Sequence, residues 1–206
     1  MLGRSEGGRP IVAWEIGDPT SPRKALVVGC IHGNEPAGIA IADALTRVSA
    51  PKHTDLWIVP DLNPDGVAAG TRQNGRGVDL NRNFPWQWHP VGQRWSPFYS
   101  GPSVMSERET RIAYTLIRRV HPTVSIWFHQ HRRLVDESGG EISLERRFAL
   151  GVGLPLLRLQ RFSGSVTTWQ NHVFPGTTSF VVELPAGDVP APRIARYVRT
   201  IDAVVR

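Results

Sequence analysis

Apolar and polar positions alternate along the chain in blocks that predict strands and helices in turn. Continuous apolar runs such as "ALVVGC" and "DLWIVPDL" are typical of strands buried on both faces. The predicted strands cover residues 10–16, 25–30, 55–62, 123–128 and 179–184. Helical spacing of apolar residues predicts helices over 36–48, 106–120, 143–153 and 191–205. This alternation predicts an α/β fold with a mixed, mainly parallel central sheet and helices on both faces.

Three local features refine this prediction. We expect Ser106 to cap the helix over 106–120, with Glu109 completing a capping box. In the helix over 143–153, we expect Glu145 and Arg146 to be exposed. Residues 63–103 have little periodicity and many Gly, Asn, Pro, Arg and Trp residues, which predicts a long loop. Such a loop in a compact domain is functional or disordered, and its Trp and Phe content favours function.

The length of 206 residues fits one domain over 1–206 with a core of its own. The hydrophobic fraction of 40% and the charged fraction of 20% are those of a globular protein. A formal net charge of +6 favours anionic partners, from nucleic acid to an acidic small substrate. The arginines are spread along the chain and form no basic arm, so we do not expect nucleic acid to be the partner.

The only cysteine, Cys30, excludes an intrachain disulfide, and its apolar neighbours predict a small buried side chain. The first residues, "MLGRSEGGRP", contain no apolar core of signal-peptide length. No apolar stretch approaches the roughly 18–20 residues of a membrane span. As given, the chain is expected to be cytoplasmic and not bound to a membrane. Secretion or a place in the cell envelope is the alternative if an export signal has been removed.

Metal-binding residue types follow two of the predicted strands. His32 and Glu35 come after the strand over 25–30, while His129 and His131 come after the strand over 123–128. Ligands of open α/β sheets bind beyond the carboxyl ends of the strands. Two His and one Glu, with a fourth position for water, form a known catalytic zinc set. Of the two histidines, we take His129, which directly follows the apolar run, as the ligand, and His131 as a residue beside the ligands or at the rim.

The motifs carry a family resemblance over residues 25–187. The segments are "HGNE", "DLNPDG", "TRQNGRGVDLNRNFP", "IWFHQH" and "TTSFVVELPAG". Together they resemble the zinc carboxypeptidase family in its compact bacterial form, closest to the murein-peptide amidase-like branch. The resemblance implies a carboxypeptidase-like α/β fold, one Zn²⁺ ion and hydrolysis of a peptide bond. It also implies a small peptide substrate with a free carboxylate, such as a cell-wall peptide that contains D-glutamate and diaminopimelate.

The same resemblance assigns the reacting groups. His32 and Glu35 match the first two zinc ligands, and His129 matches the third. Glu183, in "VVELP", matches the general base that works on the zinc-bound water. A carboxylate in that place can take a proton and pass it to the leaving amine. A charge within "SFVVEL" would be costly if buried without a partner, which supports a functional role for Glu183.

The substrate-binding residues are also implied. Asn81 and Arg82 match the pair that holds the terminal carboxylate, which suits the forked guanidinium of arginine. Arg72 matches the arginine that polarises the scissile carbonyl, with Arg76 as the competing assignment. Asp79 is expected to cap or brace this loop.

The chain departs from larger family members, which carry a Tyr on a loop over the substrate. Here no Tyr lies between residues 115 and 196, and "SVTTWQNHVFPG" takes that place. Within it, Trp169, Asn171 and His172 are the candidates for substrate contact. The residue that sets the side-chain preference is not identified, and the short chain predicts a more open cleft.

Two other functions remain open at this point. One is an N-acyl amino acid deacylase like the succinylglutamate desuccinylase and aspartoacylase branch, although "NPDG" and "DLNRNFP" favour a peptidase. The other is a catalytically silent module that keeps the fold and binds carboxylates, against which the presence of both Glu35 and Glu183 argues. The sequence predicts no oligomeric state.

Overall fold

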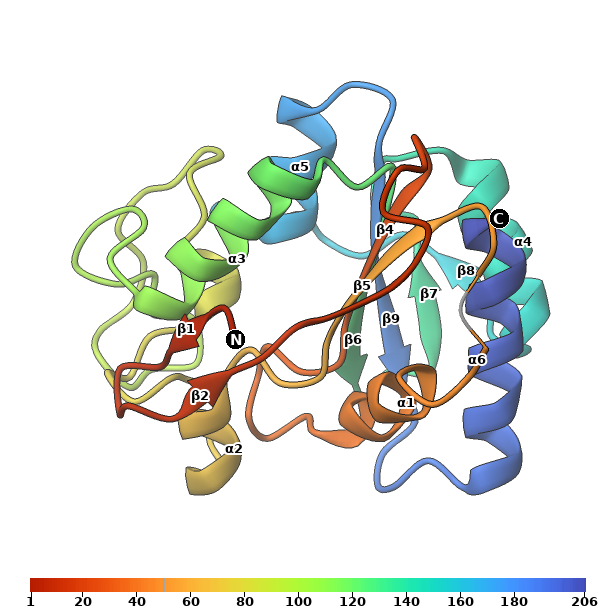
Figure 1. Ribbon diagram of the computed structural model, residues 1–206. Coiled ribbons are helices and arrows are strands. Elements are labelled where there is room, and N and C mark those ends of the chain that lie inside the picture. The colour runs from red at the N-terminus through yellow and green to blue at the C-terminus, as the bar shows by residue number, and fades with distance from the viewer. Residues whose placement is uncertain (50) are drawn as a thin grey trace.

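A seven-stranded sheet forms the centre of the computed structural model, which describes residues 1–49 and 51–206 (Figure 1). The strand order is β3-β5-β4-β6-β9-β7-β8. The strands are β3 (Trp14–Gly17), β4 (Lys24–Val28), β5 (Asp55–Val59), β6 (Val124–Gln130), β7 (Leu134–Asp136), β8 (Leu156–Leu157) and β9 (Thr178–Leu184). Pairing is parallel from β5 through β9 and between β7 and β8, and antiparallel at β3–β5 and β9–β7. The predicted mixed, mainly parallel sheet is confirmed.

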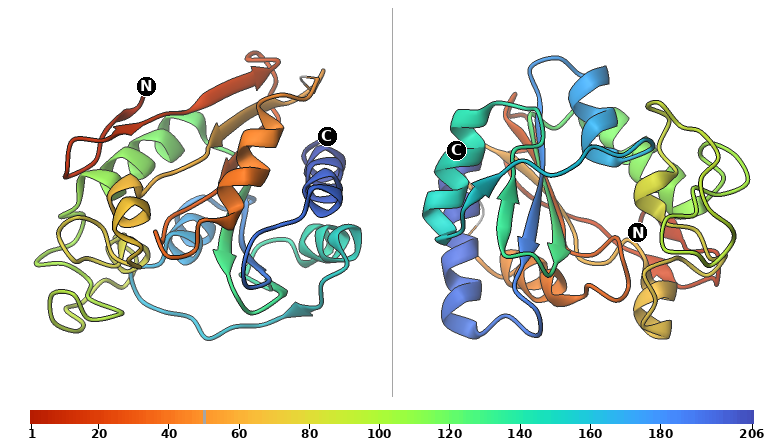
Figure 2. Two further views of the ribbon diagram at one scale, coloured as in Figure 1. Left: turned by 90° about the horizontal axis from the view of Figure 1, so that it is seen from below. Right: turned by 180° about the vertical axis from the view of Figure 1, so that it is seen from behind.

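Helices cover both faces of this sheet (Figures 1 and 2). One face is covered by α1 (Ala37–Leu45), α4 (Ile142–Val152) and α6 (Ala191–Val205). The other is covered by α3 (Arg108–Val120) and α5 (Val166–Val173). A hairpin of β1 (Gly3–Arg4) and β2 (Pro10–Ile11) packs against α3. Within the described ranges 1–49 and 51–206, no helix combines the length and apolar character needed to cross a membrane.

Alternation along the strands gives two hydrophobic cores, one on each face. On β6, Ile126 and Phe128 lie in the core beneath α1, α4 and α6, while Trp127 lies in the core beneath α3 and α5. On β9, Val181 belongs to this second core. Because side chains two residues apart share a face, His129 and Glu183 also point toward the α3 and α5 side. The period of the strand therefore selects the face on which the site forms.

The predicted helices and strands all exist, but their ends shift by a few residues. The predicted strand over 10–16 is divided into β2 and β3. The segment 63–103, predicted as a loop, holds α2 (Pro64–Ala69) and the short 3₁₀ helix η1 (Leu80–Arg82). Asn63 caps α2 by accepting the N–H of Gly66, and Gly70 ends it with a left-handed conformation. Of these two short helices, η1 contributes Asn81 and Arg82 to the lining of the site described below.

Two local predictions were wrong. The helix α3 begins at Arg108, with Glu107 as its N-cap residue and no side-chain cap bond. Ser106 instead donates its hydroxyl to Glu107, and the Glu109 carboxylate accepts the Glu6 N–H, so the capping box does not form. Glu145 is fully buried, not exposed. Its Oε1 accepts the N–H of Ser138 at 3.0 Å, which offsets part of the cost of burying this carboxyl.

Candidate metal centre and active site

The loop between β4 and α1 delivers His32 and Glu35 to the carboxyl end of the sheet. A turn closes on itself there, with the Glu35 N–H donating to the His32 carbonyl at 2.9 Å. Gly33, inside the turn, lies against the backbone of α2, and a Cβ atom there would be only 1.8 Å from the carbonyl carbon of Gly66. Only glycine fits this close approach, so the turn holds both side chains toward β6.

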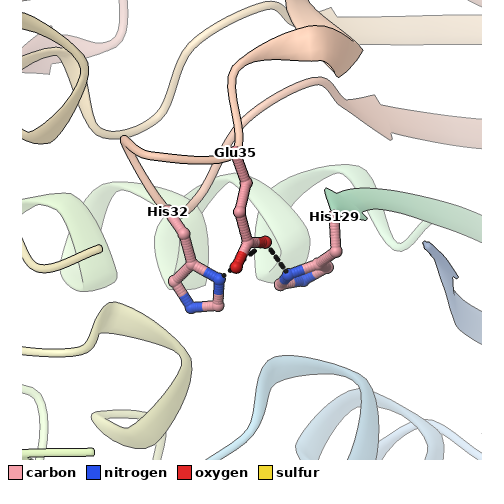
Figure 3. A group of neighbouring side chains, drawn as sticks. All are labelled: His32, Glu35 and His129. Atoms are coloured by element: carbon pink, nitrogen blue, oxygen red, sulfur yellow. Dashed lines mark hydrogen bonds and ion pairs between the residues drawn. The ribbon is translucent and has the colours of Figure 1, made fainter. Parts of the chain in front are cut away.

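His32, Glu35 and His129 converge on one point (Figure 3). The Nδ1 atoms of His32 and His129 lie 3.1 Å and 2.9 Å from the same oxygen, Oε2 of Glu35. One ligand atom from each of the three residues lies within 4.8 Å of the other two. Ligands around a tetrahedral zinc are about 3.3 Å apart for bonds of roughly 2.0 Å. The observed spacing is therefore suited to a small divalent cation.

The second nitrogen of His32 supports the same interpretation. Its Nε2 lies 3.0 Å from Oδ1 of Asp79, which is completely buried. A carboxylate that accepts a hydrogen bond from Nε2–H keeps the proton on Nε2. Nδ1 then carries the lone pair that a metal needs. Asp79 also accepts the Asn81 N–H as the cap of η1, so it braces this loop as predicted. The donor set therefore fits zinc, which is the metal named in the family that the sequence resembles.

The electrostatics of this group favour ionised carboxylates. Burial raises the pKa of the Glu35 carboxyl, but the imidazoles of His32 and His129 outweigh it and hold that pKa well below its ordinary range. Burial likewise raises the pKa of Asp79, and His32 and Arg72 outweigh it. Arg72 donates to Glu35 Oε1 at 2.9 Å and to Asp79 Oδ2 at 3.0 Å. The carboxylate of the candidate ligand is therefore charged at neutral pH.

Glu183 lies on the strand next to His129. Parallel β6 and β9 place these two residues directly opposite one another in the register. Glu183 is 9% exposed and lines the cavity of about 460 Å³ that also holds the three candidate ligands. Its Oε2 accepts a long hydrogen bond of 3.4 Å from the Arg132 N–H. A carboxylate beside the three candidate metal ligands is suited to accept and return a proton.

Arg82 and Asn81 line the same cavity from η1. Asn81 accepts the Val166 N–H through Oδ1, which fixes the orientation of its amide. Arg82 is 5% exposed, and among the described residues its Nε has no hydrogen-bond partner. An unpaired buried donor is costly, and a bound carboxylate would satisfy it. The pair is therefore suited to a substrate anion.

Two aromatic rings hold the Arg82 guanidinium in position. Its Cζ lies 4.2 Å from the ring centre of Phe162 and 5.3 Å from that of Phe98. Both rings belong to cavity-lining residues from different loops, and they stack with centroids 6.0 Å apart. Cation–π contacts of this kind fix the plane of the guanidinium while its edge can still donate hydrogen bonds. Neither Phe could be identified from the sequence, because the contact depends on tertiary structure.

Three of the residues predicted to bind substrate, namely Arg76, Trp169 and His172, do not line the cavity. The Arg76 guanidinium lies 3.8 Å from Glu6 and 3.9 Å from Glu107, on the α3 side of the loop. Trp169 is buried in the core, where it stacks on Tyr114. The His172 ring stacks on Trp86 instead. Packing against distant residues thus takes all three side chains away from the cavity.

The remaining sequence predictions concern the margin of the site. His131 is exposed and lines the rim of the cavity, as predicted. Cys30 is buried beside the turn, where its thiol donates to the His32 carbonyl and burial raises its pKa well above the ordinary value. A thiol with a raised pKa is a poor nucleophile, which agrees with a packing role.

Comparisons with known proteins agree with this geometry. A profile described as zinc carboxypeptidase matches residues 1–136. Murein peptide amidase A of Escherichia coli K12 is 30% identical over 146 residues, which cover 66% of this chain and 60% of that protein. Murein peptide amidase A of Vibrio campbellii is 29% identical over 183 residues, covering 82% of this chain and 73% of that protein. The crystal structure of murein-tripeptide amidase from Escherichia coli O157 superposes with a TM-score of 0.80 at 25% identity, covering 100% of this chain and 90% of that one.

Proposed function

Because the chain belongs to the zinc carboxypeptidase family, we propose that it is a zinc-dependent peptidase or amidase. It hydrolyses an amide bond next to a free carboxylate, in small cell-wall peptides of the murein type. The observation that carries this proposal is the convergence of His32, Glu35, His129, Arg82 and Glu183 on one cavity of about 460 Å³. The similarity to murein peptide amidases of two bacteria supports the substrate class. Since the match spans 60% of the first of these relatives, the activity is assigned to this chain as a proposal.

Zinc would be held by His32 Nδ1, Glu35 and His129 Nδ1, and it would supply a Lewis acid that polarises a carbonyl and acidifies water. Arg82 and Asn81 bind the terminal carboxylate of the peptide, which places the amide bond near the metal group. Glu183 accepts a proton from water through its carboxylate and returns it to the leaving nitrogen. Arg72 donates to Glu35 Oε1. From this place it would stabilise the negative charge that develops on the carbonyl oxygen of the substrate.

The competing functions differ in what they need from the cavity. A deacylase of acylated amino acids would also use a carboxylate-binding arginine, but the similarity is to peptidases and amidases. A silent binding module would not need a carboxylate opposite His129 in the register. Glu183 in that place therefore favours hydrolysis.

Glu183→Gln tests this proposal directly. The amide keeps the shape but cannot accept the proton, so we expect at least a thousandfold lower kcat with zinc content unchanged. Hydrolysis of a muropeptide tripeptide is measured by mass spectrometry, beside the same peptide with an amidated carboxyl terminus. Turnover of the variant equal to wild type, or equal cleavage of both peptides by wild type, would contradict the proposal.

A further inference from the structure

The cavity contains a second arginine whose donors are not all used. Arg161 donates from Nη1 to Oδ2 of Asp136 at 2.5 Å. Its Nη2 is buried, and within residues 1–49 and 51–206 it has no hydrogen-bond partner. Both residues line the cavity of the candidate active site. Since a buried guanidinium donor is costly to leave unpaired, this nitrogen is suited to bind an acceptor that a ligand brings.

Asp136 is held rigidly, so Arg161 is held as well. Asp136 is 3% exposed at the end of β7. Its Oδ1 accepts the Leu159 N–H at 2.8 Å, and its Oδ2 accepts the Ser138 hydroxyl at 2.8 Å. A guanidinium fixed in advance loses little entropy when it binds a ligand. The pair therefore resembles a prepared binding group and not a solvated surface ion pair.

The position of the pair relative to Glu183 indicates which part of a substrate it meets. In the antiparallel pairing of β7 and β9, Leu134 lies opposite Glu183 and Val135 opposite Val182. One step further, Asp136 comes level with Val181, which also lines the cavity. Two residues along a strand correspond to about 6.6 Å. On β7, Asp136 therefore lies two residues beyond the position opposite Glu183, on the same face of the sheet.

A peptide held at Arg82, with its amide bond at the metal group, directs the side chain of its last residue into the rest of the cavity. That part is lined by Val181, Thr167 and Thr168 together with Arg161 and Asp136. The cavity lining as a whole carries four arginines, Arg72, Arg82, Arg132 and Arg161, against three carboxylates, Glu35, Asp136 and Glu183. A divalent cation would add to this positive balance. The environment of the side chain is therefore polar and favours an anion.

We propose that Arg161, held by Asp136, binds a carboxylate on the side chain of the residue that is released. Under this proposal, which rests on the proposed function, the enzyme prefers peptides that end in a dicarboxylic amino acid. A side-chain amide cannot accept a charge-assisted, two-oxygen hydrogen bond and leaves Nη2 poorly paired. Arg161 is then a residue that determines specificity.

The test compares peptides that differ only at the end of the last side chain. The pairs end in glutamate or glutamine, and in 2-aminopimelate or its side-chain amide. For the acid and amide pair whose side chain is long enough to reach Arg161, we expect wild type to show at least a tenfold higher kcat/KM for the acid. This ratio corresponds to about 1.4 kcal/mol. In Arg161→Gln, the ratio should fall to near one, with kcat/KM for the amide within threefold of wild type.

Arg158→Gln is the matched control. Arg158 lies three residues earlier, has a side chain that is 69% exposed, and does not line the cavity. It should keep the wild-type ratio, and thermal unfolding verifies that both variants fold. The inference fails if Arg161→Gln keeps the ratio, if Arg158→Gln loses it equally, or if wild type shows no acid preference for either pair.

A binding measurement separates this inference from the proposed function. If wild type hydrolyses none of the peptides, the proposed function fails. Calorimetry then compares the binding of free 2-aminopimelate and its amide to the zinc-loaded wild type and to Arg161→Gln. A preference for the acid that disappears in the variant supports the carboxylate site by itself. Equal binding of acid and amide to wild type overturns it.

Discussion

Asp79 fixes the orientation of the His32 ring, because its buried carboxylate lies within hydrogen-bond distance of His32 Nε2. Asp79→Asn keeps an acceptor but removes the charge. We expect about tenfold weaker zinc binding, since outer partners of this kind contribute tenfold to a hundredfold in metal affinity. Competition with a chelator measures this constant. Asp65→Asn is the control, as Asp65 is buried and accepts from Arg9 and Gly7 away from the cavity. A wild-type constant for Asp79→Asn, or an equal loss in the control, would contradict the role.

His129 and His131 provide a second comparison between single residues. His129 Nδ1 faces Glu35, whereas His131 is exposed at the rim. We expect His129→Ala to retain less than a tenth of the zinc of wild type and His131→Ala to retain all of it, because only the first removes a ligand. Metal content after dialysis is measured by mass spectrometry. Similar zinc contents in the two variants would exclude our assignment.

Some of these residues could be predicted from the sequence because their positions depend on local structure. His32, Glu35, His129 and Glu183 follow or lie in short apolar runs, and strand ends of a parallel sheet meet at one edge. Arg161 could not be predicted in this way, since its ion pair with Asp136 joins residues 25 positions apart. Such a contact leaves no periodic trace in the sequence.

At the scale of helices and strands, the close contact between the β4–α1 turn and α2 is needed for the site. Gly33→Ala would place a Cβ atom 1.8 Å from the Gly66 carbonyl carbon and 2.2 Å from the Val67 nitrogen. Backbone atoms cannot move aside as a flexible side chain can, so we expect a loss of about 3 kcal/mol or more in the free energy of unfolding. The melting temperature should fall by roughly 6–12 °C, and zinc binding should weaken.

Gly3→Ala is the control for this change. Its Cβ atom would meet only the side chain of Ile112, at 2.8 Å, and that side chain can adjust. Its melting temperature should stay within about 2 °C of wild type. If calorimetry gives Gly33→Ala the stability and zinc affinity of wild type, the turn is not held by this contact.

The helices and strands were predicted better than the loop that joins them. Regular runs such as 191–205 have an apolar face, and α6 has the predicted bounds. The segment 63–103 was predicted as a loop because α2 and η1 are only six and three residues long. Helices this short have too few apolar positions to show a period. The capping box at Ser106 failed for another reason, since Glu109 bonds to the distant residue Glu6.

For the whole molecule, the arrangement of charge is more informative than the net charge of +6. The excess of arginine suggested an anionic partner, and four arginines line the proposed active site. Others, such as Arg76 and Arg108, pair with Glu6 on the α3 side. Composition favoured an anionic partner, but only the fold shows which arginines line one cavity.

A buried carboxyl that does not line the cavity makes global stability depend on pH. Burial raises the pKa of Glu145 to about 7, and the nearby Asp136 adds to this, as does Glu137. Its Oε1 accepts the Ser138 N–H, but among the described residues its Oε2 has no partner. The folded protein therefore binds a proton at Glu145 more tightly than the unfolded chain does, where the ordinary pKa is 4.5. The stability from this group is complete below pH 4.5 and is lost as the pH rises through about 7.

Glu145→Gln should remove this loss, since the amide stays neutral and can still accept the Ser138 N–H. Relative to wild type, we expect the variant to gain about 2 kcal/mol in the free energy of unfolding between pH 5 and pH 8. Urea unfolding at both pH values measures this change. Glu15→Gln, at an exposed position of β3, should show no such trend. A constant difference between Glu145→Gln and wild type at both pH values would mean that Glu145 does not titrate in this range.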